Sequence, residues 1–540
     1  MEKRLVLSFV LSFLVLYIWA SVTPKAQKES VPLEKSETID NKEFSMDSSS
    51  SSNLENHSTP TLLKPTSDQI QEKNYTLDSE NFILIFSSLG AKVENVFLKE
   101  YNVSLPLNNI ATIDLYNNIS FDVVEQSENS IEFFYSSDNI NIKKIFKITN
   151  GFTFNLEIQV KNKTLAQENT PIDFKCFTLN MNKLDNNEKM SKGGDDSLYE
   201  YVLNLNSGIK RKNKAHKFSM KDNVKNSEAV QWIGFRDRYY CAICKPHFNS
   251  QGYSVKMIDE KNLDITITSE NAQLSSEDMI NYSAMYYIGP EKTDILSKYD
   301  FGFQDIKRYY KFGLFDKIAK LIDWIMKLLF KFIPNWGTSI ILISIIIYYS
   351  MYPLTARGMA SMKKMQSLQP KIQVLKEKYE KNPQKLNQEM LDLYRKEKIN
   401  PLGGCFPILL QMPVFVGLYQ VLWRNVDFKG AKFLWIKDLS QPDRLFYLPF
   451  DLPVIGNEIN LLPILMIFIM FFQQKFSSKN MVLTDPMQIQ QQKMMATIMP
   501  LLLGFIFYKF ASGLTLYFTM FYIFSTLTQW KLSKETTVKK

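Results

Sequence analysis

The spacing of apolar positions changes several times along the 540 residues of the chain. From about residue 76 to residue 302, short runs of β-branched and aromatic residues alternate with polar turns, as in FTFNLEIQV (152–160). A period of two is typical of strands with one buried face. Similar runs are NFILIFSS (81–88), SIEFFYSS (130–137) and IKKIFKIT (142–149). We therefore predict an antiparallel β-sandwich over 76–302, with residues 181–228 as a long polar surface insertion.

Between residues 303 and 333 the period changes to three and four, and lysines lie between the apolar positions. The apolar positions are Phe315, Ile318, Ala319, Ile322, Ile325, Met326 and Leu329. This pattern predicts an amphipathic helix with a basic polar face, suited to a membrane interface. The alternative is a helix that packs on the β-sandwich.

Residues 334–530 contain five long apolar segments, which predict an α-helical transmembrane core. The predicted spans are 338–356, 405–423, 457–476, 494–510 and 513–530. Residues 357–400 between the first two spans are charged and carry two apolar seams around the turn Lys381–Pro383. This segment predicts a helical hairpin outside the membrane.

The first residues of the chain, 1–20, form a short apolar run behind Lys3 and Arg4, which predicts a signal-anchor transmembrane helix. We favour retention of this anchor over cleavage, because the run lacks a typical small-residue cleavage site. Residues 21–75, with an unbroken serine run at 48–52, predict a disordered Ser-rich linker.

The distribution of charge gives the orientation of these segments. Lysines in the tail, residues 531–540, match the basic N-terminus, and the hairpin 357–400 is also rich in Lys and Arg. Basic segments stay on the cytoplasmic side of a membrane. Six spans place both termini and the hairpin there, and they place the β-sandwich on the opposite side.

Polar side chains recur at spacings of three, four and seven within the predicted spans, which aligns them on helix faces. The candidate residues are Ser344, Tyr348, Thr355, Gln411, Thr497, Tyr508, Ser512, Thr515 and Thr519. An unpaired hydroxyl in hydrocarbon costs about 1–3 kcal/mol, so these faces should point inward. Two interpretations remain open: hydrogen bonds between packed helices, or a groove that contains water.

The stretch NPLGGCFPILLQMPVF (400–415) opens the second span with several helix-breaking residues. Pro407 falls in the first turn, where a missing donor matters little, whereas Pro413 lies deeper and frees a backbone carbonyl. Gln411 supplies a polar group nearby. Incompletely paired backbone is tolerated in a membrane only next to protein or water, so this stretch predicts the mouth of a polar cavity.

Several motifs closely resemble the YidC branch of the YidC/Oxa/Alb family of membrane protein insertases. They are NPLGGCFPILLQMPVFVGLYQVL (400–422), MYPLT (351–355), SMKKMQSLQPKI (361–372), TDPMQIQQQKMMATIMP (484–500) and SGLTLYF (512–518). QWIGFRDRYY (231–240) and YIGP (287–290) resemble the large periplasmic β-sandwich of YidC from two-membrane bacteria.

The resemblance implies an inner-membrane protein that inserts, folds and helps to assemble integral membrane proteins. It implies a five-helix core whose hydrophilic groove opens to the cytoplasm and to lipid, and which works without a cofactor. The implied partners are nascent integral membrane proteins, membrane lipid, the Sec translocon and the ribosome, with no specific nucleic acid. The expected hairpin contacts are Lys363, Lys364, Lys371 and Arg395.

The chain departs from the family at one position of the groove. Members of the family usually carry an arginine in the first span of the core, and alignment on MYPLT places Tyr348 there. Hydroxyls and water, with Ser344, Tyr348 and Thr515 as the lining residues, are therefore expected to replace the central positive charge.

Other chemistry has little support in the sequence. Cys241, Cys244 and His247 have metal-like spacing, but positions three apart in a strand point to opposite faces, and a clear fourth ligand is missing. Cys176 could pair with either cysteine in an oxidising compartment, but we favour three buried free thiols. Only three histidines are present, so we expect no enzyme, no catalytic residue and no metal site. The alternatives are a small-solute transporter and a membrane-anchored β-sandwich that acts on carbohydrate.

Overall fold

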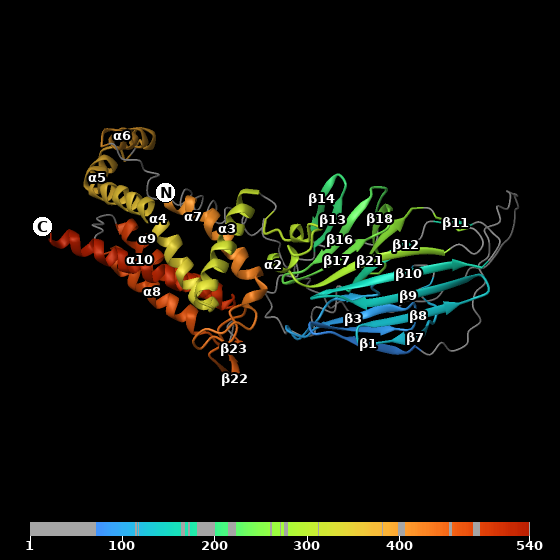
Figure 1. Cartoon of the computed structure of the whole chain (residues 1–540). Coiled ribbons are helices and arrows are strands. Elements are labelled where there is room, and N and C mark those ends of the chain that lie inside the picture. Colours follow the sequence, from blue (N-terminus) through green and yellow to red (C-terminus); the bar gives the residue numbers. More distant parts are fainter. Residues whose placement is uncertain are drawn as a thin grey trace, which may run out of the picture.

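The structure is a computed structural model with a β domain and a helical domain (Figure 1). It describes residues 72–113, 116, 118–163, 168–170, 173–180, 200–213, 223–259, 262–270, 272–274, 279–310, 313–380, 382–397, 406–452, 456–478 and 486–538. The predicted anchor (1–20) and nearly all of the predicted linker (21–75) lie outside the described residues.

The largest sheet of the β domain has nine antiparallel strands in the order β14-β13-β16-β17-β21-β10-β9-β8-β7. Its strands are β7 Asp122–Gln126, β8 Ser130–Ser136, β9 Ile140–Ile148, β10 Thr153–Asn162, β13 Glu200–Leu205, β14 Gly208–Asn213, β16 Val230–Arg236, β17 Tyr240–Pro246 and β21 Met279–Pro290. Buried positions largely alternate with more exposed ones along β10, as its period of two predicts.

Smaller antiparallel sheets complete the domain. Their strands are β1 Asn74–Asp78, β2 Phe82–Ser87, β3 Lys92–Leu98, β4 Val103–Ser104, β5 Leu107–Asn108, β6 Thr112–Ile113, β11 Glu168–Thr170, β12 Asp173–Asn180, β15 Asn223–Asn226, β18 Ser250–Met257, β19 Asn262–Ser269 and β20 Ala272–Leu274. One hydrophobic core joins the three larger sheets. The predicted antiparallel β-sandwich is confirmed.

The prediction of a surface insertion over 181–228 is wrong for its described part. This part contributes β13 and β14 to one edge of the large sheet and β15 to the edge of the six-stranded sheet. Val202 and Leu203 are buried in the core, and this burial outweighs the polar composition around them. Residues 181–199 and 214–222 lie outside the described residues.

The helical domain contains the long helices predicted from the apolar segments. Its elements are α2 Thr293–Leu296, η5 Phe303–Ile306, α3 Gly313–Phe332, α4 Trp336–Ser367, α5 Gln369–Lys378, α6 Pro383–Lys396, α7 Phe406–Arg424, η7 Val426–Phe428, β22 Phe446–Leu452, β23 Gly456–Ile459, α8 Leu461–Ser478, α9 Pro486–Phe507 and α10 Ser512–Val538. Among the described residues, only Trp336–Gly358 is long and apolar enough to cross a membrane by itself; Leu461–Phe476 and Ala496–Phe507 are shorter apolar helices.

Three predicted boundaries differ from the structure. The helix α4 continues through Pro353 to Ser367, so the first arm of the hairpin is the end of α4 followed by α5. The segment 457–476 begins as strand β23, and α8 starts only at Leu461. The tail is helical as far as Val538, because α10 runs on beyond the apolar segment.

A buried charge cluster lies where the β domain meets the helical domain. Arg236 at the end of β16 is fully buried, and its Nε lies 2.8 Å from Glu291 Oε2. Its Nη1 also donates to the carbonyl of Ile306, at 2.9 Å. Burial raises the pKa of Glu291, and Arg236 opposes this shift. The pairing satisfies an arginine that could not be buried alone.

Two further contacts tie the β domain directly to the end of α7. Arg238 donates from Nε to the carbonyl of Trp423, at 2.7 Å, and its guanidinium lies 4.9 Å from the centre of the Trp423 ring. Lys292 pairs with Asp427 at 2.8 Å. Burial opposes the charge on Lys292, but Asp427 outweighs that effect and raises the pKa of the lysine. We call this end of the bundle the β-domain end.

Candidate functional site: a polar seam in the helical bundle

Polar side chains gather where α10 packs against α4 and α8. We define the polar seam as Ser344, Tyr348, Gln411, Gln473, Thr515, Tyr517, Thr519, Ser525, Thr528 and Gln529. Tyr348 on α4 donates from its hydroxyl to Thr528 Oγ1 on α10, at 2.8 Å. Gln473 on α8 donates to Ser525 Oγ, at 2.7 Å. These bonds cross between helices in surroundings that are otherwise apolar.

The half of the seam nearer the β domain is closed. Ser344, Thr515 and Thr519 are buried, and their hydroxyls donate to carbonyls of their own helices. The acceptors are Ile340 at 2.6 Å, Ala511 at 3.3 Å and Thr515 at 2.8 Å. Such back-bonding satisfies a hydroxyl without water. In this conformation the interpretation as packed helices therefore holds for these three residues.

The other half of the seam faces the end where α4 leads into α5, which we call the hairpin end. Gln411, Gln473 and Gln529 are only half-buried there. Gln529 Oε1 is enclosed here but has no hydrogen-bond partner among the described residues. The enclosed Tyr517 hydroxyl belongs to the closed half, between Thr515 and Thr519 on α10. Gln411 lies beside the Tyr517 hydroxyl, an arrangement that a bridging water or a polar ligand would satisfy.

Four of the predicted groove residues lie away from the polar seam. Tyr508 donates to the carbonyl of Glu458, at 2.7 Å, and Ser512 donates to the carbonyl of Asp438, at 3.0 Å. Both therefore connect the β-domain end to its loop, and neither contributes to the polar seam. Thr497 on α9 is exposed and makes no part of the seam. Thr355 lies beyond the seam on α4 and donates to Met351 O, at 3.0 Å.

No arginine occupies the seam in the described residues. Arg357 is exposed beyond it, and Arg424 is buried at the β-domain end, where it donates to the carbonyl of Arg308 at 2.9 Å. Tyr348, at the position of the family arginine, is buried and forms a neutral hydrogen bond instead. The seam therefore offers hydroxyl and amide groups and no fixed charge.

The hairpin has the predicted apolar contact between its arms. Leu368 and Ile372 pack against Met390, Leu393 and Tyr394. Its charges lie outside this contact. Lys371 pairs with Glu397 at 2.6 Å, Arg395 lies 3.4 Å from Asp392, Lys364 is exposed, and the side chain of Lys363 is outside the described residues.

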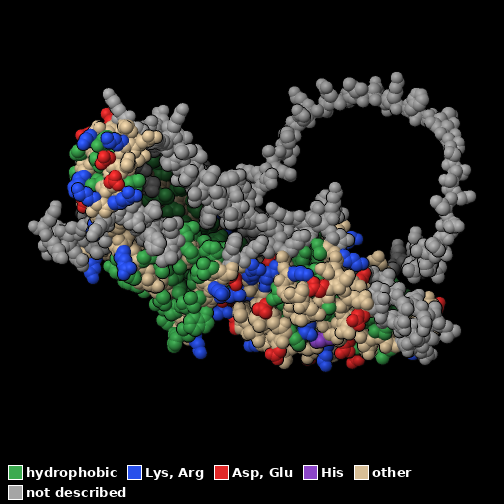
Figure 2. All heavy atoms as spheres, turned by 90° about the horizontal axis from the view of Figure 1, so that it is seen from above, with side chains coloured by type: hydrophobic (Ala, Val, Ile, Leu, Met, Phe, Trp, Pro, Cys, Tyr) green, Lys and Arg blue, Asp and Glu red, His purple; other side chains and the backbone are tan. Residues whose placement is uncertain are grey.

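On the face shown in Figure 2, apolar side chains gather over the helical bundle, whereas charged side chains are concentrated on the α5–α6 hairpin and scattered among other side chains on the β domain. The exposed apolar residues include Leu465, Phe468 and Phe472 on α8, and Leu501, Leu502 and Phe505 on α9. An exposed apolar surface of this extent is typical of a protein embedded in lipid.

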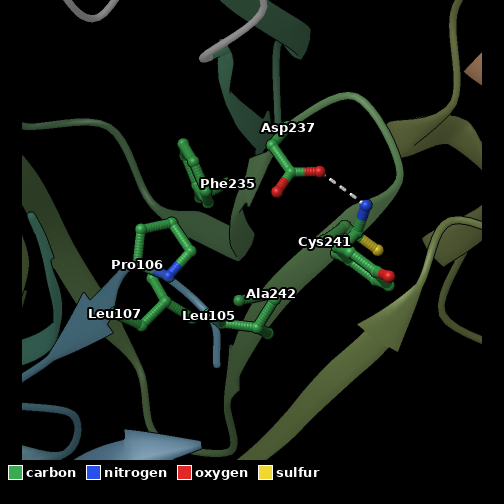
Figure 3. A pocket seen from close by; sticks show the side chains of 8 residues that line it. Leu105, Pro106, Leu107, Phe235, Asp237, Cys241 and Ala242 are labelled. Carbon is green, nitrogen blue, oxygen red and sulfur yellow. Dashed lines mark hydrogen bonds between the residues drawn. The ribbon is translucent and has the colours of Figure 1, made fainter. Parts of the chain in front are cut away.

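The β domain has a small pocket between Leu105–Leu107 and strands β16 and β17 (Figure 3). Its one carboxylate, Asp237, accepts hydrogen bonds from the backbone N–H groups of Tyr239 and Tyr240, at 2.7 and 2.6 Å. Burial raises the pKa of Asp237 and of the Cys241 thiol. The carboxylate therefore stabilises the turn between the strands.

The cysteines Cys176, Cys241 and Cys244 are free and buried. The thiols of Cys176 and Cys244 interact with each other across the core, and burial raises the pKa of the Cys176 thiol well above its usual value. In the part of the chain that the structure describes, no group of three His, Cys, Asp or Glu residues is placed to hold a metal ion.

Two family models match the chain. The model of the 60Kd inner membrane protein matches residues 328–540, and the model of the YidC periplasmic domain matches residues 114–325. Among solved structures, the chain resembles an active YidC insertase with its first transmembrane domain resolved, at 19% identity, over 85% of this chain and 92% of that chain, with a TM-score of 0.39. A galactose mutarotase-like protein from Lactobacillus casei matches 40% of the chain at 11% identity, with a TM-score of 0.32. Likeness at these TM-scores does not bear on function.

Curated relatives carry the name membrane protein insertase YidC. The protein from Cupriavidus taiwanensis is 35% identical over 329 residues, which is 59% of this chain and 55% of that protein, so the chain spans about half the length of this relative. The proteins from Endomicrobium trichonymphae and Rickettsia felis are 28% and 29% identical, and these matches cover 98% or more of each chain. Together, these matches make the chain similar to members of the YidC family along nearly its whole length.

Proposed function

We propose that the chain is an insertase and chaperone of the inner membrane, which passes integral membrane proteins into the lipid bilayer. The observation that carries the proposal is the polar seam inside an apolar bundle. Unsatisfied polar groups are costly in a membrane and usually mark a functional path. The similarity to this family supports this interpretation, because the relatives are named as insertases.

The proposed path begins at the hairpin end. Gln411, Tyr517 and Gln529 provide hydrogen-bonding groups that can replace water around a polar segment of the client. Ser512 and Tyr508 close the other end. The polar segment would thus shorten its passage through hydrocarbon, while the apolar segment of the client moves out along the exposed faces of α8 and α9.

The proposed topology places α4, α7, α8, α9 and α10 across the membrane, with the hairpin and both termini in the cytoplasm and the β domain in the periplasm. The exposed basic residues of the hairpin, Lys364, Lys371 and Arg395, would meet the ribosome or the emerging client. The Sec translocon is a further expected partner.

Reconstitution tests the proposal most simply. Proteoliposomes with the purified full chain should protect the translocated end of a newly made single-span client from added protease, whereas empty liposomes should not. Protection must fall when Gln411 and Gln529 are both replaced by leucine. Solute flux without a client would instead indicate a transporter, and unaltered insertion by the double variant would reject the seam as the path.

A further inference from the structure

We infer that the β22–β23 hairpin, together with the turn at Leu434, is an anchor that inserts into the lipid headgroup region at the β-domain end of the bundle. Both belong to the loop between α7 and α8, on the opposite side of the bundle from α5 and α6 (Figure 1). Nothing in the insertion path described above requires this loop to be apolar.

The β22–β23 hairpin exposes large apolar and aromatic side chains. Leu445, Phe446, Tyr447 and Phe450 are all exposed, and Tyr447 and Phe450 reach 59%. A two-stranded hairpin with this composition is unfavourable in water, because its apolar surface stays wet. Aromatic residues are enriched at the level of lipid headgroups, where one part of the side chain is apolar and its surroundings are polar.

Hydrogen bonds hold the base of the β22–β23 hairpin to the helices. Asp443 Oδ2 accepts hydrogen bonds from the N–H groups of Leu461 and Leu462, at 2.8 and 2.9 Å, at the start of α8. Asn460 donates to Tyr508 O, at 2.8 Å, and Arg444 pairs with Glu458 at 3.0 Å. The exposed side chains therefore project from a fixed base, as an anchor requires.

Leu434 gives an independent indication. It lies at the tip of the tight turn Phe433–Ile436, with a φ of 51° and an exposed fraction of 76%. Turns of this kind strongly favour Asn or Gly at left-handed positions. An exposed leucine at this position therefore carries two costs: a left-handed backbone conformation and an apolar side chain in contact with water. Contact of its side chain with lipid would remove the second cost and accounts for the residue.

The position of the hairpin is continuous with the apolar surface of the bundle. The hairpin leads directly into α8, whose exposed face carries Leu465, Phe468 and Phe472. Helix α3, at the same end, exposes a stripe formed by Leu314, Leu321, Trp324, Leu328 and Phe332. This continuity favours lipid over a second protein as the occupant.

Photocrosslinking of the full chain in liposomes tests the inference. The photoreactive residue p-benzoylphenylalanine replaces Phe450 or Leu434, and Val124 of β7, which is 62% exposed, serves as the control position. With radiolabelled phospholipid, we expect adducts at 450 and 434 to exceed those at 124 by about tenfold, given the preference of a phenylalanine-sized side chain for an apolar site.

Two results would overturn the anchor. One is equal lipid labelling at positions 450 and 124. The other is crosslinking at 450 mainly to a second copy of the chain or to a client protein. Unchanged thermal unfolding of each substituted chain in the same liposomes confirms that the protein tested is folded. Client insertion can be measured in parallel. If insertion is lost while the lipid adducts remain, the proposed path through the seam is wrong and the anchor is unaffected.

Discussion

Lys144 shows how one buried residue can organise a turn. It is fully buried, and its Nζ donates to the carbonyls of Gly90, Ala91 and Ala111, at 2.7, 3.3 and 3.3 Å. Ala91 and Ala111 have φ values of 43° and 67°, in the left-handed region that alanine rarely adopts. The lysine therefore stabilises strained backbone from the neighbouring strand β9.

The same residue predicts a pH dependence. Burial lowers the pKa of Lys144 from its usual 10.5 to about 7, so between these values the unfolded chain binds more protons than the folded chain. Folding stability should therefore rise as the pH increases from 7 to 9. In Lys144→Met this rise should be absent. The variant also leaves the carbonyls without their donor, which costs about 1–3 kcal/mol, and its deficit relative to the parent protein should widen as the pH rises from 7 to 9. Thermal unfolding of both proteins across this pH range measures the difference. An equal slope in the two proteins would contradict the assignment.

A substitution at Thr515 tests whether its hydroxyl has a role in insertion beyond helix packing. Its hydroxyl donates within its own helix, so Thr515→Val should change the free energy of unfolding by less than about 1 kcal/mol. We expect client insertion to fall in this variant, because a polar lining residue is lost from the seam. Thr497→Val, on an exposed position of α9, is the matched control and should insert clients normally. Full insertion activity in Thr515→Val would favour a purely structural role.

At the scale of elements, the start of α8 depends on a side chain from the preceding loop. Asp443 caps the first N–H groups of the helix and also accepts a hydrogen bond from Trp435 Nε1, at 3.1 Å. Asp443→Ala should destabilise the protein by about 1–2 kcal/mol through loss of this cap. Asp443→Asn should retain part of the stability, since its side-chain oxygen can still accept. Thermal unfolding in detergent distinguishes the two variants. An alanine variant as stable as the parent protein would show that the cap contributes nothing.

The alternation of apolar positions predicts strands such as β8, β9 and β10 well, because each strand buries one face along its whole length. Strands β13 and β22 are not predicted by this alternation. The residues of β13 are buried on almost every side, and those of β22 are largely exposed. A period of two appears only when the two faces of a strand meet different surroundings.

Candidate site residues could be predicted where their environment follows from a regular helix, and could not be predicted where it depends on distant segments. Ser344, Thr515 and Thr519 could be placed inside the bundle from their helical spacing, since α4 and α10 are regular helices there. Tyr508 and Ser512 could not, because their acceptors are backbone carbonyls of a loop some 50 or more residues away in the sequence. The role of Arg236 at the junction likewise depends on partners from three different segments.

At the scale of the whole molecule, the junction fixes the β domain on the helical domain. Lys292 and Asp427 are both largely buried and come from the two domains. Lys292→Asp should destabilise the junction by about 1–3 kcal/mol, and the second change Asp427→Lys should restore much of the loss. Spin-label distance measurements between β7 and α6 should show a broader distribution in the single variant and a narrow one in the double variant. Equal widths in all three proteins would show that this pair does not hold the domains together.

The central claim is that the polar seam receives the polar part of a client. Site-specific photocrosslinking from Gln411 and Gln529 to a ribosome-bound nascent membrane protein tests it most directly, with Val124 of the β domain as the control position. The account predicts adducts from both seam positions to the polar segment that crosses the membrane, and none from Val124. Efficient insertion of the client without any adduct from the seam would contradict the account.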